Sequence, residues 1–92
     1  MLLASGTTKM YILQYFDWNG TLDELEEAEK MVKKIIDETE GVDFKGRYSP
    51  HNKKYHWVFM FKTDSYDALM ATWPKMGRDY DKMTHAVMEI LQ

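Results

Sequence analysis

The 92-residue sequence contains no cysteine. Disulfides and thiolate metal sites are therefore excluded, and a chain without thiols suits a reducing compartment, so we expect a cytoplasmic protein. The sequence also has no surplus of positive charge, because its formal net charge at pH 7 is −3. Proteins that bind nucleic acids usually present a basic face, so a nucleic-acid partner is not expected.

Long apolar segments are lacking as well. No apolar run approaches the ~20 residues that a membrane helix needs, so we expect no contact with a membrane. Residues 1–6 have neither a basic stretch nor a long apolar stretch, and they make a poor signal peptide. Met10 opens the first convincing element. We therefore expect residues 1–9 to form a flexible extension and residues 10–92 to form a single domain.

Bulky apolar side chains are abundant, with 14% aromatic residues and eight methionines, and their spacing indicates the secondary structure. Residues 10–18 are rich in aromatic and branched side chains and stop at an Asn-Gly pair, which is typical of a strand and turn. Thr21 and Glu24 have the spacing of a helix-capping box. Apolar residues then recur at helical spacing and predict a helix over residues 22–39.

Two strands are predicted in the middle of the chain. Residues 42–48 alternate between apolar and charged side chains, apart from one glycine, which predicts a strand near the edge of a sheet. Residues 54–62 have apolar side chains on both sides, which is typical of a central strand that is covered on both faces. The turn-forming residues 49–52 between them indicate a hairpin.

The C-terminal third of the sequence is less regular. Asp64 or Ser65 is expected to cap a second helix, which Pro74 and Gly77 kink or end. Residues 83–91 fit a helix by propensity and also fit a strand. We favour the strand, because a final strand that pairs with the first one would complete the sheet.

These elements predict the α+β class, with a βαββαβ antiparallel sheet that carries two helices on one face. The other face would still carry large apolar groups, because residues 10–18 and 54–62 have them on both sides. Monomers rarely leave such a patch in water. We therefore expect a homodimer, or a higher oligomer, whose sheets pack against each other. The alternative is that residues 83–91 form a helix covering this face within one chain.

Several segments taken together resemble a known superfamily. They are the opening strand Tyr11-Ile12-Leu13-Gln14, the segment from Gly41 to Tyr48, the aromatic strand ending at Phe61-Lys62-Thr63-Asp64, the helix that carries Trp73, and the closing Val87-Met88-Glu89-Ile90-Leu91. In this order, over about residues 10–91, they look like the ferredoxin-like dimeric α/β-barrel superfamily, closest to small prokaryotic families of unknown function. The resemblance implies that two sheets close into a barrel. That superfamily includes cofactor-free monooxygenases, muconolactone-type isomerases and haem-binding enzymes, so the fold alone selects no activity.

His56 is the candidate catalytic residue. We expect it in the middle of the third strand among apolar neighbours, where an imidazole can act as acid, base or ligand. The alternative is a buried histidine that is hydrogen-bonded to the backbone or lies in the dimer interface. A metal site with His51 and His85 is disfavoured, because strands three and four would flank strand one, roughly 9–10 Å apart at the backbone. We expect neither a metal nor a cofactor.

Two further groups of residues are candidates for binding. A basic cluster around the hairpin comprises Lys45, Arg47, His51, Lys53 and Lys54. Arg47 could bind a carboxylate or phosphate, whereas the alternative is a solvated hairpin whose lysines discourage edge pairing. A pocket between sheet and helices, or simply the core, could be lined by Gln14, Tyr15, Asp17, Trp18, Tyr48, Tyr55 and Trp73. The candidate ligand-binding residues are Gln14, Arg47, Tyr48, Tyr55, Trp73 and His85.

Three functions are compatible with these observations. The protein could be a dimer that binds a small organic molecule, an oxygenase- or isomerase-type enzyme that uses His56, or a domain whose role is association alone. The sequence has no phosphate-binding glycine loop, no paired-carboxylate motif and no nucleophile–base pair. We therefore favour small-molecule binding, and we expect a cavity at His56 if the protein is an enzyme.

Overall fold

The computed structural model describes residues 10–50, 54–76 and 82–91. The expected extension at residues 1–9 and the second half of the predicted turn, residues 51–52, lie outside the described residues. The elements follow one another as β1 (Met10–Trp18), α1 (Leu22–Asp37), β2 (Val42–Tyr48), β3 (Trp57–Thr63), α2 (Tyr66–Met70), α3 (Trp73–Met76) and β4 (Met83–Leu91). The four strands form one sheet in the order β2-β3-β1-β4, and each neighbouring pair is antiparallel.

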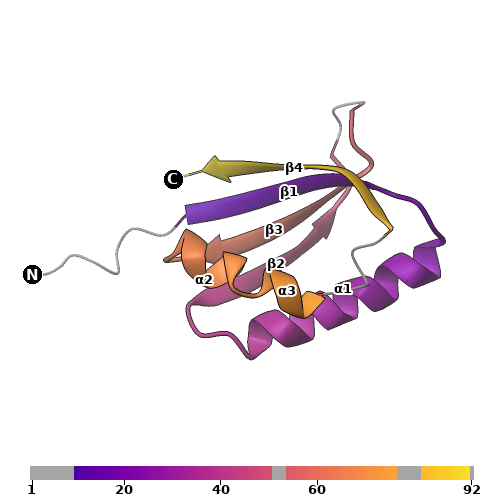
Figure 1. The fold of residues 1–92 in the computed structure, drawn as a ribbon. Helices are drawn as coiled ribbons and strands as arrows, with labels where there is room; N and C mark the ends of the chain where they lie inside the picture. Colours follow the sequence, from indigo (N-terminus) through magenta and orange to yellow (C-terminus); the bar gives the residue numbers. More distant parts are fainter. Residues whose placement is uncertain (1–9, 51–53, 77–81, 92) are drawn as a thin grey trace, which may run out of the picture.

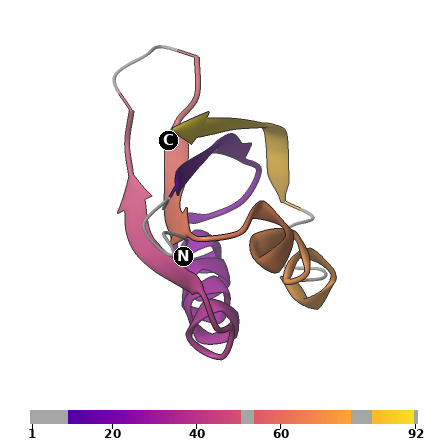
Figure 2. The same ribbon diagram turned by 90° about the vertical axis from the view of Figure 1, so that its left-hand side faces the viewer.

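All three helices lie on the same side of the sheet, and the opposite side carries no helix (Figures 1 and 2). The core lies between these two layers. The sheet contributes Ile12, Phe16, Phe59 and Phe61, and the helices contribute Leu25, Val32, Ile36, Leu69 and Met76. This arrangement confirms the predicted βαββαβ class.

The first helix begins at the predicted capping box. The Thr21 hydroxyl accepts a hydrogen bond from the Glu24 backbone N–H at 3.1 Å, and the Glu24 carboxylate accepts one from the Thr21 N–H at 2.9 Å. The helix ends at Asp37, two residues before the predicted end. The chain then turns through Gly41, whose φ of +84° belongs to the left-handed region that glycine adopts without strain.

The hairpin of β2 and β3 is present, with β2 at the edge and β3 inside the sheet as predicted. The pairing register shifts between Phe44 and Gly46, where Gly46 has a φ of +116°, so the break in the sequence alternation is a β-bulge. The third strand begins at Trp57 and not at residue 54. The prediction that His56 lies in the middle of this strand is therefore wrong.

The helical segment after β3 consists of two short helices. Ser65 caps α2 by accepting a hydrogen bond from the Ala68 N–H at 3.2 Å. The helix ends at Met70, upstream of the predicted break at Pro74, and the Thr72 hydroxyl then donates to the Leu69 carbonyl at 2.6 Å. Pro74 lies in the first turn of α3, where a proline needs no N–H partner. The predicted contribution of Gly77 lies outside the described residues.

The C-terminal segment is the strand β4, which pairs with β1 and therefore leaves the other face of the sheet uncovered. We call the side away from the helices the open face. By strand alternation and register it carries Tyr11, Leu13, Tyr15, Val58, Met60, Lys62, Val87, Glu89 and Leu91. Tyr11, Val87 and Leu91 are 38%, 46% and 48% exposed, so this face carries large apolar groups in contact with water.

Candidate functional site

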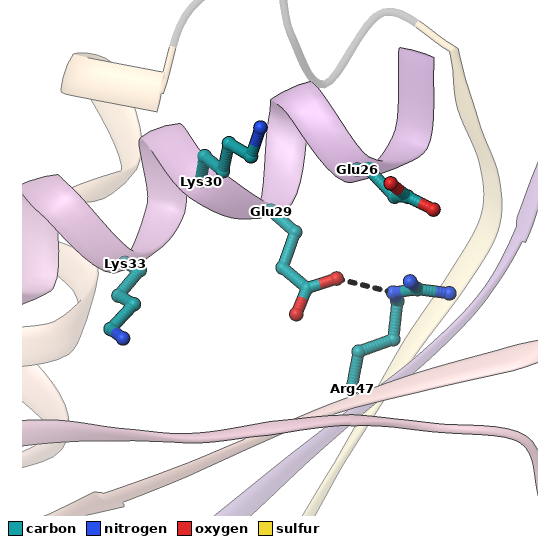
Figure 3. A pocket seen from close by; sticks show the side chains of 5 residues that line it. All are labelled: Glu26, Glu29, Lys30, Lys33 and Arg47. Atoms are coloured by element: carbon teal, nitrogen blue, oxygen red, sulfur yellow. Dashed lines mark hydrogen bonds and ion pairs between the residues drawn. The ribbon is translucent and has the colours of Figure 1, made fainter. Parts of the chain in front are cut away.

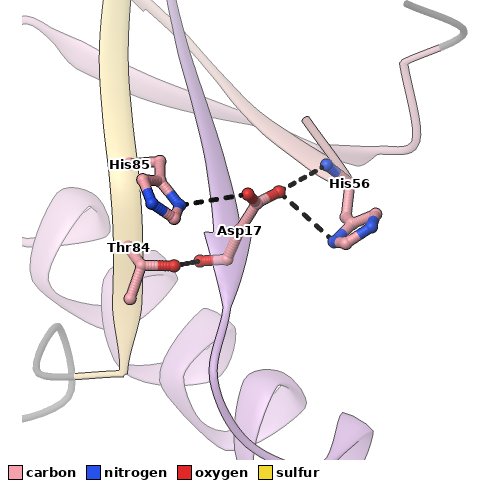
Figure 4. Close-up of polar contacts among 4 residues, drawn as sticks. All are labelled: Asp17, His56, Thr84 and His85. Atoms are coloured by element: carbon pink, nitrogen blue, oxygen red, sulfur yellow. Dashed lines mark hydrogen bonds and ion pairs between the residues drawn. The ribbon is translucent and has the colours of Figure 1, made fainter. Parts of the chain in front are cut away.

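Asp17, near the C-terminal end of β1, contacts His56, just before β3, and His85, in β4, through its carboxylate (Figure 4). One oxygen accepts a hydrogen bond from the His56 backbone N–H at 3.0 Å and lies 3.2 Å from the His56 Nδ1. The other oxygen lies 3.3 Å from the His85 Nδ1. A single carboxylate thus holds one imidazole beside the start of β3 and another on β4.

A bulge in β4 places His85 beside Asp17. The register between β1 and β4 shifts between Tyr15 and Asp17, and His85 has a φ of +55°, which is uncommon for a residue other than glycine. The hydroxyl of the preceding Thr84 donates to the Asp17 carbonyl at 3.4 Å. The unusual backbone at His85 is therefore held by two contacts to β1, one from its own side chain and one from Thr84.

A depression of about 330 Å³ lies beside this cluster and is lined by Asp17, Lys54, Tyr55 and His85. The Tyr55 ring packs against the Tyr15 ring of the open face, with centroids 5.6 Å apart. The Lys54 Nζ lies 6.0 Å from the centre of the Tyr55 ring. The depression therefore combines an aromatic wall with a carboxylate, an ammonium and an imidazole at one end of the open face.

The contacts of Asp17 determine what the two imidazoles can do. A carboxylate oxygen accepts a hydrogen bond only from an imidazole nitrogen that carries a proton, so the tautomer with the proton on Nδ1 is the one in which His85 donates to Asp17. The second nitrogen of each ring lies on the side away from Asp17 (Figure 4). In a neutral ring that nitrogen is an acceptor, which can receive a hydrogen bond or a proton from a bound molecule.

Tyr15 and Glu89 form a second polar contact on the open face. The Tyr15 hydroxyl donates to the Glu89 carboxylate at 3.1 Å. Burial raises the pKa of the Tyr15 hydroxyl, and the hydrogen bond and negative charge of Glu89 raise this pKa further. Tyr15 therefore remains a protonated hydrogen-bond donor near neutral pH.

Arg47 lies on the helix side of the sheet, away from the Asp17 cluster. Its Nε lies 2.5 Å from a carboxylate oxygen of Glu29 on α1 (Figure 3). Its guanidinium also stacks over the Trp57 ring, 4.4 Å from the ring centre. A charged groove of about 370 Å³ lies beside this pair and is lined by Glu26, Glu29, Lys30, Lys33 and Arg47. The contacts with Glu29 and Trp57 hold Arg47 on the helix side of the sheet. His51 and Lys53 of the predicted basic cluster lie outside the described residues.

The structure separates the other predicted ligand-binding residues. Gln14 is only 2% exposed and lies in the core on the helix side of β1. Trp73 begins α3 and packs against the same core, whereas Tyr48 ends β2 and donates its hydroxyl to the Lys45 carbonyl at 2.6 Å. Of the six candidates, only Tyr55 and His85 share the depression.

His56 is not the buried residue that the sequence suggested. Its side chain is 79% exposed, and the residue precedes β3 because its backbone N–H bonds to the Asp17 carboxylate. Asp17 itself was named only among possible pocket-lining residues. Its alternation with Tyr15 places it on the open face, but nothing in the sequence shows that both imidazoles turn toward it. Within the described ranges, no group of three potential metal-binding residues is placed to hold an ion.

Comparison with known proteins identifies the fold. No family model and no curated protein matches the sequence. Among solved structures, a dabb family protein with a ferredoxin-like fold from Mesorhizobium loti is 14% identical, with a TM-score of 0.70 over 91% of this chain and 95% of that one. The chain has the ferredoxin-like fold. This finding confirms the predicted ferredoxin-like fold class.

Two other solved structures that resemble this chain have different descriptions. A dimeric protein of unknown function from Jannaschia sp. is 17% identical, with a TM-score of 0.67 over 92% of this chain and 99% of that one. SnoaB from Streptomyces nogalater, a cofactor-independent oxygenase, is 11% identical, with a TM-score of 0.68 over 91% of each chain. At these identities the likeness establishes the ferredoxin-like fold and no activity. In the part of the chain that the structure describes, no helix is both long and apolar enough to cross a membrane.

Proposed function

We propose that this protein is a homodimer that binds a small organic molecule at the end of its open face. The observation that carries the proposal is the depression beside Asp17, where Lys54, Tyr55 and His85 meet. Small-molecule sites usually combine apolar walls with a few polar groups that fix the orientation of the ligand. This depression has both components. The absence of cysteine supports a reducing compartment such as the cytoplasm.

The apolar side chains of the open face support the homodimer. Tyr11, Val87 and Leu91 are 38–48% exposed there, and each would gain less than the roughly 1.5–3 kcal/mol that full burial of an exposed apolar side chain contributes. Neighbours with the same fold from Jannaschia sp. and Thermobifida fusca are described as dimeric. A second copy of this chain laid on the open face would remove these groups from water and form the wall of the depression opposite Tyr55.

The binding proposal can be tested with three simple aromatic probes: phenol, benzoate and benzylamine. We expect at least one of them to shift the two-dimensional NMR signals of Tyr55 and His85. Tyr55→Ala should weaken that binding, because it removes the aromatic wall of the depression. Tyr66→Ala, at an exposed tyrosine on α2, is the matched control and should bind as the wild type does. Absence of shifts at Tyr55 and His85 with all three probes would contradict the proposal.

A cofactor-independent oxygenase or an isomerase is the second candidate. The observation that favours it is the contact of Asp17 with His56 and His85, because a carboxylate-held imidazole is suited to remove a proton from a substrate. The likeness to SnoaB agrees with this chemistry. The test is oxygen uptake by 1,3-dihydroxynaphthalene, measured against its uptake without protein. We expect acceleration that His56→Gln reduces, and equal rates with and without protein would exclude this activity for that class of compound.

A further inference from the structure

We propose that the depression selects hydroxyaromatic molecules, with His85 accepting the hydroxyl proton and Asp17 orienting the His85 ring. The inference rests on the proposed binding function and names the chemical class of the ligand. His85 is assigned the acceptor role, and not His56, because only His85 lines the depression together with Asp17, Lys54 and Tyr55.

The two carboxylate oxygens of Asp17 contact different histidines. One oxygen is occupied by His56, through the backbone N–H at 3.0 Å and Nδ1 at 3.2 Å. The other oxygen is thereby directed to the His85 Nδ1 at 3.3 Å. With its Nδ1 bonded to a carboxylate, the neutral His85 ring presents Nε2 as an acceptor. The depression therefore offers a bound molecule an acceptor that is held in position.

The other lining residues of the depression, Tyr55 and Lys54, provide an aromatic surface and a positive charge. The Tyr55 ring is held by the Tyr15 ring at 5.6 Å, and tilted aromatic pairs of this kind are stable packing units. A planar aromatic molecule can therefore pack against a wall that is already ordered. The Lys54 ammonium lies 6.0 Å from the centre of the Tyr55 ring, which is the ring that an aromatic ligand would contact.

The charges of Asp17 and Lys54 disfavour ligands that carry a carboxylate or an amine. A carboxylate ligand would bring a second negative charge beside Asp17 and would have no proton to give to His85. An amine would place a positive charge beside Lys54. A phenol donates a hydrogen bond to the His85 Nε2, and Lys54 stabilises the negative charge that develops on its oxygen. The combination of Asp17, Lys54 and His85 therefore fits an acidic hydroxyl best.

The proton transfer that follows is balanced within the site. The O–H bond of the ligand breaks, its electron pair stays on the oxygen, and the proton forms an N–H bond at the His85 Nε2. The resulting imidazolium lies between the Asp17 carboxylate and the phenolate, so each new charge has an opposite neighbour. The reaction needs no oxidant, metal or other reactant.

The test uses 4-nitrophenol, whose phenolate absorbs visible light at a longer wavelength than the phenol. The matched probe is 4-nitroanisole, which has the same ring and no ionisable hydroxyl. Slightly below neutral pH, we expect the full-length protein to bind 4-nitrophenol about tenfold more tightly than 4-nitroanisole and to increase the phenolate band. His85→Gln should remove both the preference and the band increase, while 4-nitroanisole binding is retained.

Variants separate the roles of the neighbouring residues. Lys54→Gln should reduce the phenolate band, whereas Lys62→Gln is the matched control, because the Lys62 ammonium lies 5.4 Å above the Tyr11 ring elsewhere on the open face. Asp17→Asn should move the His85 proton from Nδ1 toward Nε2, which the ¹⁵N chemical shifts of the ring report directly. An unchanged tautomer in this variant would overturn the positioning role of Asp17.

Two results would overturn the inference in distinguishable ways. If both probes bind equally well and the phenolate band does not grow, the depression binds aromatic molecules whether or not they carry a hydroxyl group. The ligand class then fails and the proposed binding function stands. If neither probe shifts the NMR signals of Tyr55 and His85, the ligand class fails, and the proposed binding function fails with it when phenol, benzoate and benzylamine also give no shifts.

Discussion

Asp17 connects three segments of the sheet. Its carboxylate accepts a hydrogen bond from the His56 backbone N–H and lies 3.2 Å from the His56 Nδ1 and 3.3 Å from the His85 Nδ1, and its carbonyl accepts a hydrogen bond from the Thr84 hydroxyl. These contacts fix the start of β3 and the bulge of β4 against β1. A residue that only bound ligand would make no such contacts between strands.

Replacing Asp17 should therefore destabilise the fold even without a ligand. We expect Asp17→Asn to lower the free energy of unfolding by about 1–3 kcal/mol, because an amide cannot accept all the bonds that the carboxylate accepts. Urea unfolding monitored by circular dichroism measures this change. Asp43→Asn, at an exposed position of β2, is the control and should stay within about 0.5 kcal/mol of the wild type. Equal losses in both variants would argue against the role of Asp17.

Glu24 is the second residue with a measurable consequence. The pKa of its carboxyl is lowered from the usual 4.5 to about 2, first by the hydrogen bond from Lys82 at 2.7 Å and then by the bonds from Thr21. Because this pKa is lower in the folded protein, Glu24 stabilises the fold above pH 4.5, and the stabilisation is lost as the pH falls from about 4.5 to about 2.

This linkage predicts the behaviour of two variants in acid. The unfolding temperature of the wild type should fall between pH 5 and pH 2, and the decline should be shallower in Glu24→Gln and in Lys82→Gln. Thermal unfolding followed by circular dichroism at several pH values tests this expectation. If the unfolding temperature of both variants falls with pH as steeply as that of the wild type, the Glu24–Lys82 pair does not contribute to the acid sensitivity of the fold.

At the scale of elements, the edge strand β2 depends on one glycine. Gly46 has a φ of +116°, and a Cβ added there would lie 3.1 Å from the Tyr48 hydroxyl oxygen. We expect Gly46→Ala to cost about 1–3 kcal/mol of stability, because an L side chain rarely adopts this backbone conformation. Urea unfolding measures the loss, and Lys45→Ala, at the exposed neighbouring position, should change it little. A Gly46→Ala variant with the wild-type free energy of unfolding would contradict the expectation of backbone strain.

The elements also show where sequence patterns are informative. The capping box of Thr21 and Glu24 and the alternation in β2 were predicted correctly, because both signals are local. The start of β3 was predicted three residues too early, since the strand is ended there by a bond between His56 and the distant Asp17. A bond across 39 residues of sequence leaves no periodic signal.

At the scale of the whole molecule, the open face is the surface through which we propose that the homodimer forms. If the homodimer forms through this face, size-exclusion chromatography with light scattering should give about twice the chain mass of 11.0 kDa. Leu13→Lys places a charge in the middle of the face and should yield a folded monomer. Leu22→Lys, at an exposed leucine on α1, is the matched control and should remain dimeric. A monomeric wild type at micromolar concentration would contradict the homodimer.

Assembly and ligand binding are connected through the position of the depression. Tyr15 belongs to the open face and holds Tyr55, which is the wall of the depression. A partner that covers the open face would therefore also limit access to Asp17 and His85. In the proposed homodimer the partner would limit the size of the ligand, whereas Asp17, Lys54 and His85 of one chain provide the polar groups of the depression.

The sequence by itself determined the βαββαβ order, the position of β2 at the edge, and the presence of apolar groups on both faces of the sheet. These features follow from local periodicity and capping, which residues near in sequence decide among themselves. Only the tertiary structure decided that Arg47 pairs with Glu29 on the helix side and that His56 and His85 meet at Asp17. The reason is that side-chain directions at a bulge or a strand end depend on partners from distant parts of the chain, and the two-residue period carries no information about them.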